Sequence, residues 1–236
     1  MRICNNNYPL IGNESEIYNR LLDLDGKNIL ELGCGKAEFT FAIAKDGNNR
    51  KLVAMEVDRQ QLEINLQLPK SENVSFCYGA AEDIALEDSS QDIVLMFKSL
   101  HHVPENKMVA AMNEIQRVLK TDGLLYVSEP VFSGDINEVL RLFHDEEIVR
   151  QSAFNTLTQS VADGGFTLEE EVFFSIHVEF NSFSDFADKT INVSHSDHRL
   201  SENLLAEVKN KFEQLSALNK GLFSVPHRVD LLRNSK

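Results

Sequence analysis

The sequence predicts an α/β protein with a Rossmann-like, seven-stranded, mostly parallel sheet and helices on both faces. Through about residue 132, short apolar strands alternate with helices, which is typical of consecutive βαβ units. The fourth predicted strand, residues 92–97, is apolar throughout its interior, as buried parallel strands are. These two observations predict βαβ units that form one parallel sheet.

The first half of the chain supplies five of the predicted strands. They are expected at residues 28–32, 52–57, 74–78, 92–97 and 124–128. Helices are expected at 14–24, with Asn13 as its N-cap, at 38–45 and at 59–68. A further helix carries Met108, Met112, Ile115 and Leu119 on one stripe and is expected to end at Asp122 and Gly123.

The second half adds the last two strands and a helical insertion. Helices are expected at 135–143 and 147–162, and residues 172–180 alternate strictly as a long strand. Residues 181–221 read as an insertion with helices at 183–191 and 202–219, and residues 222–232 form the last strand. Pro226 in that strand suggests an edge position or a bulge. We expect a single domain over residues 1–236, with the insertion on the substrate side.

Composition and charge narrow the class of partner. The formal net charge is −14 and no cluster of Lys or Arg stands out, so no nucleic-acid partner is expected. No apolar run approaches the roughly 20 residues of a membrane span. Residues 1–7 lack the apolar core of a signal peptide, which makes the cytoplasm the expected location. Cys4, Cys34 and Cys77 are read as reduced thiols, because their number and spacing fit no disulfide framework or zinc site.

A glycine turn follows the first strand. Gly33 and Gly35 precede a helix and let the backbone approach a ligand closely. Glu38 stands where a dinucleotide-binding turn has its third glycine, and it would repel a pyrophosphate. Glu31 suits a ligand with a positively charged amino group. A plain strand-to-helix turn and a nicotinamide-dependent oxidoreductase remain the alternatives.

An acidic residue ends the second strand. Glu56 lies 23 residues after Gly33, where a carboxylate is placed to accept both hydroxyls of a ribose. Asp58 is the second candidate for this role, and a surface charge is the alternative without a ligand.

Further motifs follow in a fixed order and carry a family resemblance. Together with the glycine turn and Glu56, residues 80–84, 91–96, 100–103 and 114–123 resemble the class I S-adenosylmethionine-dependent methyltransferases. The nearest subgroup is that of the quinone-biosynthesis C-methyltransferases and related small-molecule enzymes. The resemblance covers residues 28 to about 130.

The resemblance implies a cofactor, S-adenosylmethionine, with S-adenosylhomocysteine as product, and a role for each matching residue. Glu56 would hold the ribose, and Ala81 would offer its backbone N–H to the adenine ring. The Phe97 carbonyl would lie near the amino group of the cofactor. The methionine portion would be bordered by Glu31, Gly33, Cys34 and Gly35, with Lys36 nearby.

Two positions depart from the family pattern. Ala37 stands where a third glycine is frequent, and alanine is small enough to keep the turn open. Ala80, in the adenine-binding segment, stands where a polar side chain is frequent. Glu82 or Asp83 must therefore supply the contact to the exocyclic amine.

His101 and His102 follow the fourth strand, near the expected position of the transferred methyl group. His101 is the candidate general base, while His102 is expected to pack at the start of a helix. Methyl transfer need not use a base. His195, Asp197 and His198 form no complete metal-ligand pattern and are expected in a solvated loop, so no metal site is predicted.

The expected reaction is methyl transfer to an O, N or C nucleophile of a small molecule. The phenylalanine-rich last third indicates an apolar or aromatic acceptor, although core packing accounts for most of those rings. A methyltransferase acting on protein or RNA, and a non-catalytic S-adenosylmethionine-binding protein, are the alternatives.

Overall fold

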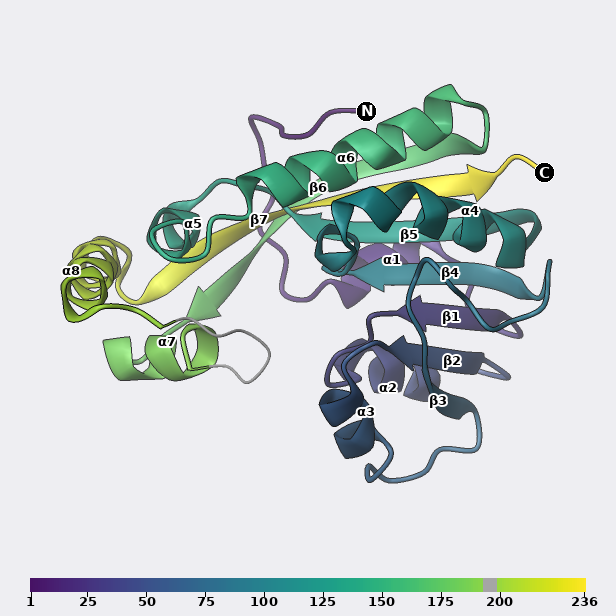
Figure 1. Ribbon diagram of the computed structural model, residues 1–236, viewed down its shortest axis with the longest axis horizontal. Coiled ribbons are helices and arrows are strands. Elements are labelled where there is room, and N and C mark those ends of the chain that lie inside the picture. Colours follow the sequence, from purple (N-terminus) through teal and green to yellow (C-terminus); the bar gives the residue numbers. More distant parts are fainter. Residues whose placement is uncertain (193–198) are drawn as a thin grey trace.

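The seven predicted strands form one mixed sheet in the computed structural model, which describes residues 1–192 and 199–236. Within these residues the strand order is β3-β2-β1-β4-β5-β7-β6, and β7 runs antiparallel to both neighbours (Figure 1). The predicted fold class is confirmed. The strands are β1 (Asn28–Leu32), β2 (Lys51–Glu56), β3 (Val74–Tyr78), β4 (Gln91–Phe97), β5 (Leu119–Pro130), β6 (Phe166–Glu179) and β7 (Leu222–Asn234).

Helices cover both faces of this sheet. Two short 3₁₀ turns, η1 (Leu100–His102) and η2 (Glu105–Lys107), follow β4. The α-helices of the described residues are α1 (Ser15–Leu21), α2 (Glu38–Lys45), α3 (Arg59–Asn65), α4 (Met108–Val118), α5 (Asp135–Leu140), α6 (Glu147–Ala162), α7 (Phe183–Thr190) and α8 (Glu202–Asn219).

Strand β1 shows how one apolar run serves two cores. Side chains alternate across a strand, so Leu30 faces one side of the sheet and Ile29 the other. Leu30 belongs to the core that includes Met112 of α4 and Leu157 of α6. Ile29 belongs to the core that includes Ile43 of α2. A strand buried on both faces has no polar side, which explains why its buried part, Ile29 to Leu32, is apolar apart from Glu31.

The end of helix α4 differs from the prediction. The helix stops at Val118, and Leu119 already belongs to β5, opposite Gln91. The side-chain amide of Asn234 donates hydrogen bonds to the carbonyls of Leu119 and Lys120. A residue at the far end of the chain therefore stabilises an extended backbone where local periodicity predicts helix.

Pro226 lies in an inner strand, because β7 pairs with β5 on one side and β6 on the other. The carbonyl of Pro226 accepts a hydrogen bond from Val131, beyond the last β5–β7 pair, Pro130 with His227. The proline nitrogen therefore faces the side where β5 has already ended. The missing N–H therefore costs the sheet no hydrogen bond. Pro226 lies at a local edge, although β7 as a whole is an inner strand.

The segment predicted as an insertion carries α7 and α8, between β6 and β7. Figure 1 shows these two strands reaching past the rest of the sheet toward α5, α7 and α8. A separate apolar cluster joins these elements, centred on Phe186, Phe212 and Phe223. The sequence-based expectation for His195, Asp197 and His198 lies outside the described residues.

The described helices include none that is long and apolar enough to cross a bilayer.

Because the apolar cluster of the insertion is separate, truncating its central ring, Phe212, should destabilise the insertion locally. Phe212→Ala should destabilise the insertion by about 3–5 kcal/mol, because it removes a fully buried phenyl ring that contacts several other rings. Hydrogen exchange measured by mass spectrometry should show faster exchange in α7 and α8 than in β1 to β4. Leu218→Ala on the same helix, where Leu218 is 72% exposed, is the control. Equal acceleration across the whole sheet would show that the cluster is not an independent unit.

Candidate functional site

The glycine turn at the carboxyl end of β1 requires glycine for two reasons. Gly33 and Gly35 have φ angles of +70° and +51°, in the left-handed region. A Cβ atom at Gly33 would also lie 2.7 Å from the Cβ of Ser99, so the turn and the residues after β4 are in direct contact. Ala37 is left-handed too, at φ +62°, and it caps helix α2. The backbone here is shaped for a close approach.

Glu56 is bound to this turn. Its carboxylate accepts hydrogen bonds from the N–H groups of Gly35, at 2.8 Å, and of Val57 and Asp58, both at 2.9 Å. The Asp58 carboxylate instead caps helix α3 by accepting from Gln60. A carboxylate offers about four acceptor positions, so these three bonds leave Glu56 one, while the Asp58 carboxylate is used by its own helix.

Glu31 lies beneath the turn and is only 1% exposed. One of its oxygens accepts a hydrogen bond from the Thr40 hydroxyl, at 2.5 Å. Burial raises the pKa of Glu31 to about 7, because the ionised form loses its hydration, and the nearby charge of Glu56 adds to the effect. Glu31 is the group in the turn that gains most from a cationic ligand.

The other side chains at the turn are Cys34, Lys36 and, from α3, Asn65. Burial raises the pKa of the Cys34 thiol, so this side chain is a packing element rather than a nucleophile. The amide of Asn65 donates to the Gly35 carbonyl, at 2.7 Å, and fixes the far side of the turn. Lys36 is exposed.

The segment predicted to bind adenine follows β3 and lies next to Glu56. Gly79 donates a backbone hydrogen bond to the Glu56 carbonyl, at 3.3 Å. Ala80 and Asp83 then form a tight turn, with Ala81 buried at its tip. The Glu82 carboxylate is paired with Lys107, at 2.8 Å, and Asp83 is exposed. Of the two acidic candidates, Asp83 is the one without an ion pair in the described structure.

Phe97 ends β4 and its ring is buried in an aromatic stack. The ring lies 4.1 Å from that of Phe39, in stacked geometry, and 5.5 Å from that of Tyr126. The side chain therefore supports the turn from below. The hydroxyl of Ser99, two residues on, donates to the Leu32 carbonyl, at 2.9 Å, and joins the end of β4 to the end of β1.

The two histidines differ from the sequence-based picture. His101 is 5% exposed, and its Nδ1 makes a short hydrogen bond with Glu129 at the end of β5. Its Nε2 lies 3.7 Å from Glu146, at the start of α6. His102 is the exposed member of the pair. The candidate base is thus held between two carboxylates, and its neighbour is exposed to solvent.

Sequence reasoning missed these two carboxylates. Burial alone would raise the pKa of Glu129, but His101 and the Leu100 N–H, at 2.8 Å, hold it below its usual range. The available signal was the position of Glu129 at the carboxyl end of a parallel strand, the same kind of position as that of Glu56. Glu146, in a loop distant along the chain, carried no such signal.

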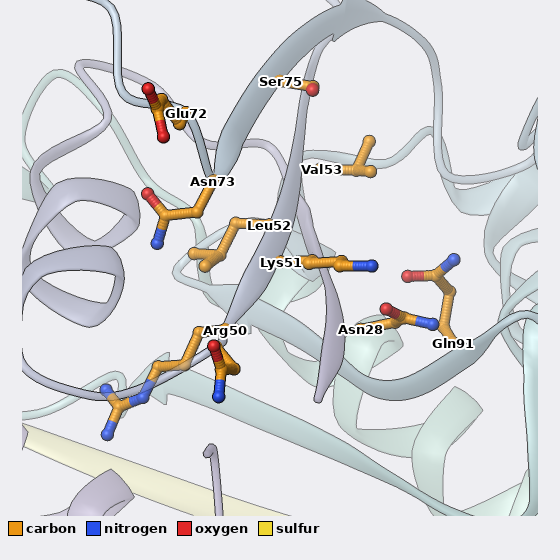
Figure 2. A pocket seen from close by; sticks show the side chains of 10 residues that line it. Asn28, Arg50, Lys51, Leu52, Val53, Glu72, Asn73, Ser75 and Gln91 are labelled. Carbon is orange, nitrogen blue, oxygen red and sulfur yellow. The ribbon is translucent and has the colours of Figure 1, made fainter. Parts of the chain in front are cut away.

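One cavity next to the sheet lies away from the glycine turn. A cavity of about 500 Å³ is lined by the first residues of several strands, at the edge opposite the glycine turn. Figure 2 shows Lys51 extending there toward Asn28 and Gln91. None of the predicted cofactor residues lines it, and ligands of doubly wound sheets bind at the carboxyl ends of the strands.

A comparison with protein families identifies the domain. A family model described as a methyltransferase domain matches residues 23–222. The chain therefore belongs to the methyltransferase domain family, in the class I S-adenosylmethionine-dependent group. Membership implies S-adenosylmethionine as the methyl donor.

Curated relatives narrow the comparison to a subgroup. The demethylmenaquinone methyltransferase of Lactococcus lactis subsp. lactis (strain IL1403) is 32% identical over 108 residues, 44% of this chain and 42% of that protein. The enzyme of the same name from Staphylococcus aureus (strain MRSA252) is 30% identical over 106 residues, 44% of this chain and 43% of that protein. The matched segment thus spans less than half the length of these relatives. The resemblance to the quinone-biosynthesis subgroup is confirmed as a distant homology.

Solved structures agree on the fold alone. A protein of Bacillus halodurans C-125 superposes with a TM-score of 0.68 at 18% identity, covering 95% of this chain and 100% of that one. An S-adenosylmethionine-dependent methyltransferase from Mesorhizobium loti gives 0.55 at 13% identity, covering 94% and 97%. The [4+2]-cyclase SpnF gives 0.62 at 19% identity, covering 93% and 80%. One fold thus carries more than one chemistry.

The raised pKa of Glu31 predicts a pH effect on stability. A carboxyl group whose pKa is higher in the folded state contributes fully below its ordinary value of 4.5, and the contribution is lost as the pH rises through about 7. The parent should therefore lose on the order of 3 kcal/mol of unfolding free energy between pH 4.5 and 8, and Glu31→Gln should abolish this loss. Urea denaturation at several pH values measures this. The exposed Glu38→Gln variant should keep the parental pH dependence, and an identical profile for both variants would contradict the assignment.

Proposed function

We propose that the protein transfers a methyl group from S-adenosylmethionine to an O, N or C nucleophile of a small molecule, leaving S-adenosylhomocysteine. The observation that carries the proposal is the hydrogen bond from the left-handed Gly35 to the Glu56 carboxylate, at the carboxyl ends of β1 and β2. This is the edge of a doubly wound sheet where nucleotide-like ligands bind.

The residues of the turn fit the cofactor in charge and in space. A ribose hydroxyl can take the remaining acceptor position of Glu56. A positively charged amino group near Glu31 would favour the ionised carboxylate and offset the cost of its burial. The turn around Gly35 is open, with no atom within 4 Å of the place a Cβ would occupy. When bound, the cofactor supplies a methyl group on a sulfonium, which is a strong electrophile.

The protein's own contribution is mainly orientation of the acceptor. Holding a nucleophile in line with a reactive group can supply most of the acceleration without a base. An O or N acceptor also releases a proton, and we assign its uptake to His101. The Glu129 carboxylate, bound to Nδ1, fixes the orientation of that ring.

The acceptor is proposed to be apolar or aromatic. Most phenylalanines of the last third are packed in the insertion core, so they say little about a ligand. Phe132, just after β5, is partly exposed and lies under the guanidinium groups of Arg141 and Arg150, at 5.2 and 5.9 Å. Because Arg150 also pairs with Glu146, this ring lies at the same edge as His101. The net charge of −14 opposes an RNA substrate.

Thermal melts test the cofactor assignment. S-adenosylmethionine and S-adenosylhomocysteine at 100 times Kd should each raise Tm by roughly 5–10 °C, and NADH should not. Glu56→Ala should lose most of this shift, measured against its own ligand-free Tm, because the carboxylate is expected to bind the ribose. Glu63→Ala, which removes an exposed carboxylate of α3, is the matched control. Stabilisation by NADH alone would show that the turn binds a dinucleotide.

Turnover distinguishes an enzyme from a binding protein. With a panel of apolar and aromatic phenols, amines and activated carbon acids, we expect S-adenosylhomocysteine to form with at least one member. Formation should fall at least tenfold in Glu56→Ala and stay unchanged in Glu63→Ala. Calorimetric binding of S-adenosylmethionine without product on any acceptor would favour the non-catalytic alternative.

A further inference from the structure

Two imidazoles and a carboxylate converge at the edge of the sheet next to the glycine turn. One ligand atom each from His101, His102 and Glu146 lies within 4.8 Å of the other two. We propose that these three residues bind a divalent transition-metal ion such as Zn²⁺. The inference departs from the sequence-based expectation, because η1 and the start of α6 are brought together only by the fold.

The spacing between the ligand atoms fits a metal better than a hydrogen bond. His101 Nε2 and Glu146 Oε1 are 3.7 Å apart, longer than an N–H···O hydrogen bond. Two ligands at about 2.1 Å from a tetrahedral ion are about 3.4 Å apart. A shift of a few tenths of an ångström would therefore bring both atoms to an ion placed between them.

The less exposed ligands, the buried His101 and the half-buried Glu146, are each held by other residues. His101 Nδ1 is hydrogen-bonded to Glu129, which leaves Nε2 directed toward the gap. Glu146 Oε2 accepts from Arg150, at 2.5 Å, and Oε1, which lies 3.7 Å from His101 Nε2, is also 2.8 Å from His144 Nε2. An ion in the gap would therefore share Oε1 with His144 or replace that hydrogen bond. Metal-bound histidines and carboxylates are typically held by such outer hydrogen bonds.

An ion-pair network alone does not account for His102. Its ring lies 4.1 Å from that of His101, and its ring nitrogens make no hydrogen bond within the described part of the chain. Imidazole and carboxylate together are a donor set suited to Zn²⁺ and neighbouring transition metals. His144 Nε2, 2.8 Å from Glu146 Oε1, is a further imidazole at this place.

The position of the cluster suggests what the ion would do. His102 donates its backbone N–H to Ser99, the residue that touches Gly33, so the ion would lie close to the glycine turn. Three protein ligands leave a coordination position open, as in catalytic rather than structural zinc sites. If the proposed methyl transfer holds, that position would take a heteroatom of the acceptor. In the metal-bound form His101 Nε2 is occupied, so the ion, by lowering the pKa of the bound acceptor, would assist proton loss in place of the free imidazole.

Metal binding is tested with the untagged full chain and no cofactor. The protein is stripped with EDTA and titrated with ZnCl₂ by calorimetry, and bound zinc is counted by mass spectrometry. We expect one Zn²⁺ per chain. We also expect a Co²⁺-substituted protein with visible d–d bands. His102→Ala and Glu146→Gln should each weaken Zn²⁺ binding at least tenfold, and Glu129→Gln by about 10–100-fold.

The controls separate this site from other outcomes. His177→Ala removes an exposed histidine of β6 and should bind as the parent does. His102 is exposed, so His102→Ala should keep the parental Tm and its stabilisation by S-adenosylmethionine, whatever happens to the metal. A parent chain that binds no Zn²⁺ overturns the proposal, and so does parental affinity in both His102→Ala and Glu146→Gln. Neither result bears on the cofactor, which the melts test independently.

Discussion

Three backbone N–H groups meet at the Glu56 carboxylate, and the carboxyl edge of the sheet depends on this interaction. A buried carboxylate is costly unless donors surround it, so the turn after β1 and the start of the β2–α3 connection are held to one point. The Met55 carbonyl adds to this by accepting from Gly33 and Cys34. Gly33 is thereby positioned against Ser99, which sets where η1 begins. The positions of the glycine turn and of the histidine pair are thus fixed by one connected set of contacts.

Most of the fold could be predicted from local patterns, because strands buried on both faces must be apolar and their helices must be amphipathic. The errors arise where distant residues decide. Leu119 continues a helical stripe, yet Asn234 holds its carbonyl in an extended strand. Pro226 suggests an edge, and only the early end of β5 explains how an inner strand contains it.

The site was predictable to a lesser degree. Glycines after a strand and an acid at the next strand end are short-range signals, so Gly33 and Glu56 stand out in the sequence. The two carboxylates around His101 belong to β5 and to the start of α6, and no regular spacing in the sequence connects them to His101. Exposure is equally a property of the fold. The sequence cannot tell which of two adjacent histidines is exposed to solvent, and in the structure it is His102.

The long β6–β7 pair connects the sheet beneath the glycine turn to a separately packed apolar cluster. The cluster around Phe212 shares no residue with the cores that support the glycine turn. Substitutions that reshape this outlying part can accumulate without loosening the cofactor half, and the reverse also holds. If the insertion contacts the acceptor, the choice of acceptor can change at the far end of the β6–β7 pair while the residues of the glycine turn stay the same.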